Sequence, residues 1–254
     1  KYENLGRGKD VNVEFVSANP TGPLHAGHAR GAVLGDCLAT ILKSVGYNVT
    51  REYYINDAGS QIETLIKSAH LRYLEQLNET KINIPEDFYP GDYLIDIGKK
   101  IKNKYSTSLE SSEFSEFFPK IKDIVINDIL DLIKTDLSNL GVKMDIFTSE
   151  NSIITKGYLE KVFKILKSKK LIYQGVLDKP KGKSNIEDWE PRPQLLFKSS
   201  LFGDDSDRAL KKSDGSWTYF ANDMAFHLYK IEKTKANIIN ILGADHYGYL
   251  SRIE

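Results

Sequence analysis

The sequence predicts an α/β fold built on a parallel sheet. Two observations carry this prediction: a strand–loop–helix–strand unit over residues 11–55, and a continuous apolar strand at 236–242. Residues 11–17 alternate in polarity and are rich in β-branched side chains, which is typical of a strand. A second strand follows at 47–55, after a helix long enough to serve as the crossover that parallel neighbours require.

The segment between these two strands begins with residues typical of a loop and ends with a glycine typical of a helix end. Two prolines and a glycine within residues 19–23 prevent a continued strand or a long helix, so we expect a tight loop there. A helix rich in small and apolar residues follows at 26–45, and Gly46 stands where a glycine commonly ends a helix. Cys37 falls within the apolar residues of this helix, so we expect it to be packed.

The remainder of the chain divides into amphipathic helices, short strands and irregular segments. Apolar residues at helical spacing predict four more helices, at 60–77, 119–140, 156–170 and 217–232. A short apolar run predicts a strand at 144–147. Residues 78–93 are expected to be irregular, and residues 171–217, rich in Gly, Pro, Lys and Asp, are expected to form surface hairpins.

The composition excludes several classes of protein. The 254 residues hold 35 lysines and arginines against 35 aspartates and glutamates, which argues against a chain that grips nucleic acid by bulk charge. No apolar run approaches the roughly 18 residues of a membrane span, so no membrane partner is expected. The single cysteine excludes a disulfide framework and a thiolate zinc site, and predicts a cytoplasmic protein. The chain lacks an initiator methionine and stops in mid-pattern at Glu254, so we expect a fragment.

The first candidate site is His25-Ala26-Gly27-His28, at the start of the helix after the first strand. Parallel α/β sheets bind ligands at the carboxyl ends of their strands, and a helix N-terminus favours phosphate. Two imidazoles three residues apart could donate to phosphate oxygens, and Gly27 leaves room for a flat ring. The alternatives are a pair of capping or surface histidines and, less favoured, a metal pair.

The ordered set of motifs resembles class I aminoacyl-tRNA synthetases and, more narrowly, the arginyl-tRNA synthetases. The resemblance begins with the run from Val13 to His28 and continues, in the expected order, through residues 53–59, 141–145, 202–205, 212–220 and 243–249. It implies a Rossmann-like parallel sheet with a largely helical insertion. The implied division is 1–66 for the first half of the catalytic domain, 67–141 for the insertion and 142–254 for the remainder, with hairpins near 171–217.

The resemblance also implies substrates and site residues. The substrates would be arginine, ATP with Mg²⁺, and tRNA(Arg) in the full-length enzyme, which we expect to be a monomer. Catalysis and ATP binding would involve the histidine motif, with Asp245 and His246 at the end of the last strand: His25, Gly27, His28, Asp245 and His246. Arginine would contact Glu14, Asn19, Tyr219 and Asp223, with Asp223 on the guanidinium. Tyr219 and Asp223 are four residues apart and therefore share a helical face.

The sequence departs from the whole family pattern in three ways. No Lys-Met-Ser-Lys-Ser-like loop is found before Glu254, residues 21–23 hold no lysine that could replace it, and neither the N-terminal tRNA-contacting domain nor the C-terminal anticodon-binding domain is present. We therefore expect the 254 residues alone not to charge tRNA. Two other hypotheses stay open: another ATP-using nucleotidylyltransferase with the same histidine motif, and a non-catalytic arginine-sensing module.

Overall fold

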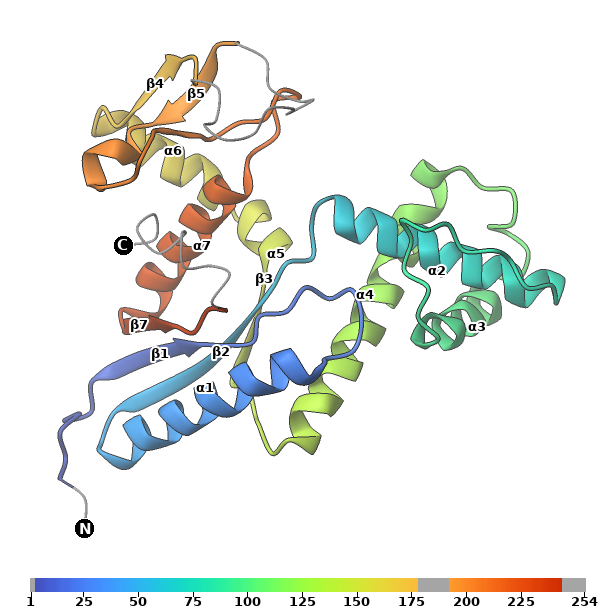
Figure 1. Cartoon of the computed structure of the whole chain (residues 1–254), viewed down its shortest axis with the longest axis horizontal. Helices are drawn as coiled ribbons and strands as arrows, with labels where there is room; N and C mark the ends of the chain where they lie inside the picture. Colours follow the sequence, from blue (N-terminus) through green and yellow to red (C-terminus); the bar gives the residue numbers. More distant parts are fainter. Residues whose placement is uncertain (1–2, 178–191, 244–254) are drawn as a thin grey trace. The chain divides into compact units, whose positions relative to one another are not determined.

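The computed structural model describes residues 3–177 and 192–243 (Figure 1). The chain forms two compact units, which are described separately below. The first unit comprises Lys1–Asn151 with Ile239–Ile241, and the second comprises Ser152–Ile238 with Leu242–Glu254.

A four-stranded sheet, in the order β3-β2-β1-β7, organises the first unit. Its strands are β1 (Asp10–Glu14), β2 (Asn48–Ile55), β3 (Ile146–Ser149) and β7 (Asn237–Asn240). β1 is parallel to β2 and β2 is parallel to β3. The Ile241 amide, just beyond β7, donates to the Glu14 carbonyl at 2.8 Å. The predicted parallel α/β sheet is confirmed. β7, the last strand of the described residues, lies beside β1, the first.

Helix α1 (Ala26–Ser44) connects β1 to β2, as predicted. Gly46 has φ +92, so the helix ends with a left-handed glycine as expected. Phe15, fully buried below the helix, lies so close to Gly35 that a Cβ there would come within 2.1 Å of its ring. The prediction for Cys37 was wrong, because its side chain is exposed on the opposite side of α1 together with Ile41.

Three helices follow the β1–α1–β2 unit: α2 (Ser60–Asn78), α3 (Tyr93–Tyr105) and α4 (Phe114–Asn139). The sequence prediction missed α3, whose buried side chains Leu94, Ile97 and Ile101 have helical spacing. Gly98 on the same face explains how α3 lies against α2, since a Cβ there would come within 2.7 Å of the backbone carbon of Arg72. Figure 1 shows α2 and α3 side by side.

Helix α4 begins five residues before the predicted start at Pro119. A proline inside a helix normally removes one hydrogen bond and strains the preceding turn. The additional turn is stabilised by burial of Phe117, whose ring stacks on His70 of α2 with centroids 3.9 Å apart. The His70 Nε2 in turn donates to the Leu109 carbonyl at 2.9 Å.

The second unit combines helices with a small antiparallel sheet. Its elements are the remaining helices and strands of the described chain: α6 (Tyr158–Ser168), β4 (Ile172–Gly175), β5 (Gln194–Phe197), the 3₁₀ helix η1 (Ser199–Phe202), β6 (Arg208–Ala209) and α7 (Tyr219–Thr234). A short helix, α5 (Glu150–Thr155), runs from the first unit into the second. Within the described part of residues 171–217, β4, β5 and β6 are antiparallel neighbours in the order β4-β5-β6.

Candidate functional site

The chain turns sharply immediately after β1. Val16 and Ser17 have φ +68 and +41, in the left-handed region that non-glycine residues rarely adopt. The predicted strand 11–17 was therefore too long, because it ends at Glu14. The turn aims the Ser17 hydroxyl at the Glu14 carboxylate, at 3.0 Å, while the Tyr54 amide donates to the same hydroxyl at 3.0 Å. The strained turn at Val16 and Ser17 therefore holds Glu14, one of the candidate arginine ligands, in place.

Tyrosine hydroxyls anchor the loop that follows. The Tyr53 hydroxyl donates to the Ala18 carbonyl at 2.8 Å and the Tyr93 hydroxyl to the Thr21 carbonyl at 2.5 Å. Burial raises the pKa of both phenols, so they are neutral donors at physiological pH. The loop is therefore fixed by β2, through Tyr53, and by α3, through Tyr93.

Asn19 lies in this anchored loop with an exposed side chain. Its Nδ2 donates to the Gln61 Oε1 at 2.7 Å. The loop ends where the Leu24 amide donates to the Asp136 carboxylate of α4 at 2.9 Å. The candidate Asn19 is therefore presented at the surface on a loop that is tied down on both sides.

His25, Gly27 and His28 together form the N-terminus of α1. The His25 Nδ1 accepts from the Gly27 amide at 3.1 Å, the His28 Nδ1 accepts from the His25 amide at 3.3 Å, and the two rings stack with centroids 3.7 Å apart. A Cβ at Gly27 would come within 3.0 Å of the His25 ring, so any larger residue would push that ring out of this arrangement by a few tenths of an ångström. Both Nδ1 atoms therefore cap the start of α1, as the capping alternative predicted, and both Nε2 atoms take no part in the cap.

This capping determines the tautomer of each ring in its neutral form. Because each Nδ1 accepts a hydrogen bond, each neutral ring carries its proton on Nε2. Burial lowers the pKa of His28, and the nearby charge of His25 lowers it further. Two Nε2–H donors therefore stand at the positive end of the α1 helix dipole, which is a suitable arrangement for phosphate.

The sheet carries a buried polar network on the face that includes Glu14. Glu52, the register partner of Glu14 on β2, is 1% exposed and accepts from Asn12 at 2.6 Å and from Thr148 at 2.5 Å. The sequence interpretation missed these residues. The sequence feature that could have revealed them is the spacing of two residues between polar side chains, as in Asn12 and Glu14 of β1. Side chains two apart in a strand lie on the same face of the sheet.

Asp57 follows β2 just before α2 but does not cap that helix, since the N-cap of α2 is Gly59, without a side-chain cap. Asp57 instead accepts from the Ser149 hydroxyl at 2.6 Å and from the Asn151 amide at 2.9 Å. It therefore joins the carboxyl ends of β2 and β3.

Tyr219 and Asp223 lie in the second unit, one turn apart at the start of α7. Thr218 caps this helix by accepting from the Ala221 amide at 3.3 Å. Tyr219 is 53% exposed. The His227 Nδ1 donates to the Asp223 carbonyl at 2.8 Å. The predicted shared helical face of the pair is confirmed, and His227 is tied to the backbone of its own helix.

The structure brings His25, Gly27 and His28 into one cluster and places Glu14 and Asn19 on the adjoining strand end and loop. Asp245 and His246 lie outside the described residues. In the described ranges 3–177 and 192–243, no group of three or more His, Cys, Asp or Glu side chains is arranged to hold a metal ion. No helix in the same ranges is long and apolar enough to cross a membrane.

Comparison with known proteins decides the family. The family model for the catalytic domain of class I tRNA synthetases of the arginine type matches residues 1–251. The chain belongs to this family. Among its relatives, the arginine–tRNA ligase of Wolbachia pipientis from Culex pipiens is 55% identical over 251 residues, covering 99% of this chain. The arginine–tRNA ligase of Orientia tsutsugamushi strain Ikeda is 50% identical over 254 residues.

The fold of the synthetase family is also found in solved structures. A crystal structure of an arginyl-tRNA synthetase from Campylobacter jejuni superposes with a TM-score of 0.82 at 36% identity, and covers all of this chain but 51% of that protein. The synthetase of Thermus thermophilus has the same fold, with a TM-score of 0.56. The chain spans 43% of the length of the Wolbachia and Orientia relatives.

Proposed function

We propose that this chain is the catalytic core of an arginine–tRNA ligase of the cytoplasm. It would activate arginine with ATP and transfer it to the 3′ end of tRNA(Arg), within a longer, monomeric enzyme. The observation that carries the proposal is the stacked pair of imidazoles at the α1 N-terminus, on the connection that follows the strand end bearing Glu14.

The arginine site would use charged and neutral acceptors. Asp223 would pair with the guanidinium, whose fixed planar donors match a carboxylate. Glu14 and Asn19 would hold the α-amino group or backbone of the substrate, and Tyr219 would line the pocket. Glu14 is 8% exposed, so water would screen its attraction for a bound cation only weakly.

The ATP site would use the α1 N-terminus. His25 and His28 would donate their Nε2 hydrogens to phosphate oxygens, and Gly27 would let the nucleotide approach the backbone. Asp245 and His246 would border the same site. Mg²⁺ would arrive with ATP and supply charge neutralisation on the phosphates.

The reaction would proceed in two steps. The arginine carboxylate attacks the α-phosphorus of ATP, which breaks the bond to the β-phosphate and releases pyrophosphate. A ribose hydroxyl at the tRNA 3′ end then attacks the adenylate carbonyl and releases AMP. The carboxylate is already ionised at neutral pH, so the first step needs positioning and stabilisation of phosphate charge rather than a general base.

Ligand-induced thermal shifts of the 254-residue chain test the arginine site. Arginine should raise Tm, whereas lysine and citrulline should raise it much less, because a ligand that binds only the native state stabilises it by mass action. Asp223→Ala should abolish the arginine response. Asp131→Ala is the matched control, since the Asp131 side chain is 71% exposed on α4 and should leave the response intact.

Equal shifts with arginine, lysine and citrulline would exclude the guanidinium site and favour another nucleotidylyltransferase. A response to arginine without any response to ATP would favour the sensing module. Aminoacylation of tRNA by the isolated 254 residues would contradict our expectation that these residues alone do not charge tRNA.

A further inference from the structure

The connecting loop, residues 18–24, lies between the strand end that bears Glu14 and the histidines of α1. Asn19, a candidate arginine ligand, is its second residue, and His25 follows its end directly. Two prolines in the loop lack a backbone N–H, so the loop forms few backbone hydrogen bonds of its own. The position of the candidate ligands therefore depends on the side chains that hold this loop.

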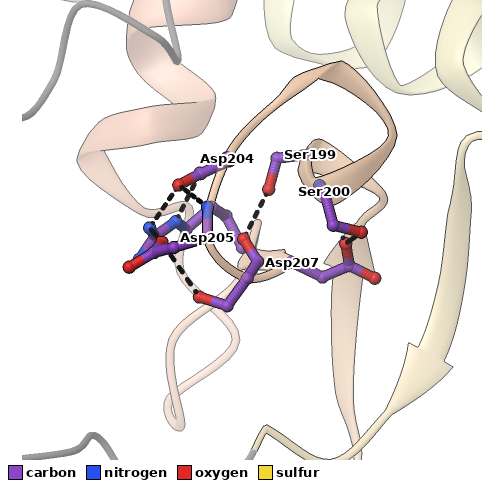
Figure 2. A network of polar contacts seen from close by, with 7 residues as sticks. Ser199, Ser200, Asp204, Asp205 and Asp207 are labelled. Atoms are coloured by element: carbon purple, nitrogen blue, oxygen red, sulfur yellow. Dashed lines mark hydrogen bonds and ion pairs between the residues drawn. The ribbon is translucent and has the colours of Figure 1, made fainter.

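The loop after η1 in the second unit offers a contrast, because it is held by its own residues (Figure 2). The Arg208 guanidinium donates to both oxygens of Asp204, at 2.7 and 2.6 Å. The Ser199 hydroxyl donates to the Ser206 carbonyl at 2.8 Å. Internal bonds of this kind keep a loop in shape, whereas the connecting loop is held by residues of other elements.

Tyr93, the first residue of α3, holds the first half of the connecting loop. Its hydroxyl donates to the Thr21 carbonyl at 2.5 Å, and the Thr21 amide donates to the Asn19 carbonyl at 2.7 Å. Because burial raises the pKa of Tyr93, the hydroxyl keeps its proton at neutral pH. Two successive hydrogen bonds therefore connect α3 to the backbone of Asn19.

Two glycines leave the space that the Tyr93 ring occupies. A Cβ at Gly91 would lie 2.1 Å from the ring carbon Cε1, and a Cβ at Gly22 would lie 3.1 Å from the hydroxyl oxygen. Neither glycine has a positive φ, so each provides space rather than an unusual backbone conformation. A side chain at Gly91 would displace the ring, and one at Gly22 would push the loop away from it.

The segment just before Tyr93 is itself fixed on α2. The Arg72 guanidinium, which is buried, donates to the Pro90 carbonyl at 2.6 Å. The Tyr89 amide donates to the Ser68 hydroxyl at 3.0 Å. Tyr93 therefore belongs to a packed pair of helices, and its hydroxyl holds the connecting loop against them.

Helix α4 holds the other end of the connecting loop. One carboxylate oxygen of Asp136 accepts from the Leu24 amide at 2.9 Å, and the next residue is His25, the N-cap of α1. The two anchors thus act at different places. Tyr93 acts beside Asn19, and Asp136 acts beside the histidines.

We propose that Tyr93 and Asp136 are positioning residues of the substrate site, Tyr93 for arginine and Asp136 for ATP. This inference rests on the proposed function, which assigns arginine to Asn19 and ATP to the histidines. Each residue acts through the loop backbone rather than by touching a substrate. When an anchor is removed, the loop populates other conformations, and the apparent dissociation constant rises as the binding-competent fraction falls.

Isothermal titration calorimetry of the 254-residue chain, with arginine and with Mg·ATP in separate experiments, tests the proposal. Tyr93→Phe keeps the ring but removes the donor, and should weaken arginine binding by roughly 2- to 10-fold, the equivalent of one neutral hydrogen bond, with a smaller effect on ATP. Asp136→Ala removes a charged acceptor and should weaken ATP binding by about tenfold, with a smaller effect on arginine. A purely structural role would weaken both ligands alike.

Tyr105→Phe is the matched control for Tyr93→Phe. The Tyr105 hydroxyl, at the other end of α3, donates to the Lys120 carbonyl at 2.8 Å, so the control loses a bond of the same kind far along the helix. It should leave both dissociation constants unchanged, as should Asp131→Ala, the control for Asp136→Ala. An equal loss of arginine binding in Tyr105→Phe and Tyr93→Phe would overturn the role of Tyr93.

Hydrogen exchange of the unliganded chain separates this proposal from the proposed function. Tyr93→Phe should speed exchange in peptides that cover residues 18–24 by roughly 2- to 10-fold, whereas Tyr105→Phe should not. If the parent chain binds neither ligand while this exchange still depends on Tyr93, the proposed function fails and the anchoring of the loop stands. If the parent chain and Tyr93→Phe bind arginine equally well, the positioning role fails and the proposed function stands.

Discussion

Substitution of Gly35 by alanine tests how α1 packs on the sheet. An alanine Cβ at this position would lie 2.1 Å from the Phe15 ring, whereas ordinary contacts are 3.4–4 Å. The ring would have to retreat by more than an ångström, yet Phe15 is fully buried in the core of the first unit. Overpacking of this kind costs about 3 kcal/mol, and the better helix propensity of alanine returns about 1 kcal/mol.

Gly31, one turn earlier in α1, is the matched control. Nothing lies within 4 Å of a Cβ built there, so only the gain in helix propensity applies. We expect Gly35→Ala to lower the free energy of unfolding by about 2 kcal/mol and Gly31→Ala to raise it by about 1 kcal/mol. At about 2–4 °C per kcal/mol for a chain of this size, Tm should fall by roughly 4–8 °C for Gly35→Ala and rise slightly for Gly31→Ala.

Urea unfolding followed by circular dichroism measures both variants. Phe15→Leu combined with Gly35→Ala should recover part of the loss, because the smaller side chain leaves room for the methyl group. If Gly35→Ala is as stable as Gly31→Ala, the close approach of α1 to Phe15 is not what holds the helix in place.

Other substitutions test the packing of α2 against α3 and α4, and the exposed face of α1. Gly98→Ala should lower the urea midpoint despite its helix propensity, since its Cβ would lie 2.7 Å from the rigid backbone of Arg72; an unchanged midpoint would refute the α2–α3 contact. Burial lowers the pKa of His70 below 6.5, so the unfolded chain binds more protons in that window and stability should fall as the pH drops through it. His70→Phe, which keeps the stack on Phe117, should flatten this dependence, and an equally steep profile would exclude His70 as its source. Cys37 should react promptly with a thiol reagent in the native chain, and protection until urea is added would contradict its exposure.

The central strands and the first helix could be predicted because local pattern and tertiary environment agree there. The spacing of apolar residues in α1 and β2 repeats with the period of each element, and Gly46 ends the helix by local backbone chemistry. The histidine cap was likewise visible, since its hydrogen bonds join residues within three positions of each other.

The features that were missed depend on contacts between distant segments. Helix α3 has a short apolar stripe and a glycine that lowers its helix propensity, and only the approach of Arg72 explains why Gly98 is required. Asp57 has the residue type of a local cap but binds Asn151, which is far along the chain. The left-handed turn at Val16 contradicts the preference of a β-branched residue, and the surrounding fold must impose it.

The return of β7 to the side of β1 has a consequence for synthesis on the ribosome. β1 is translated well before β7, and its outer edge stays open until Ile241, whose amide bonds to the Glu14 carbonyl, has left the exit tunnel. Throughout that interval the nascent chain exposes an unpaired strand edge, a recognised starting point for wrong pairing. Translation stalled before residue 241 should therefore yield a first unit that chaperones retain, and release of the following residues should free it.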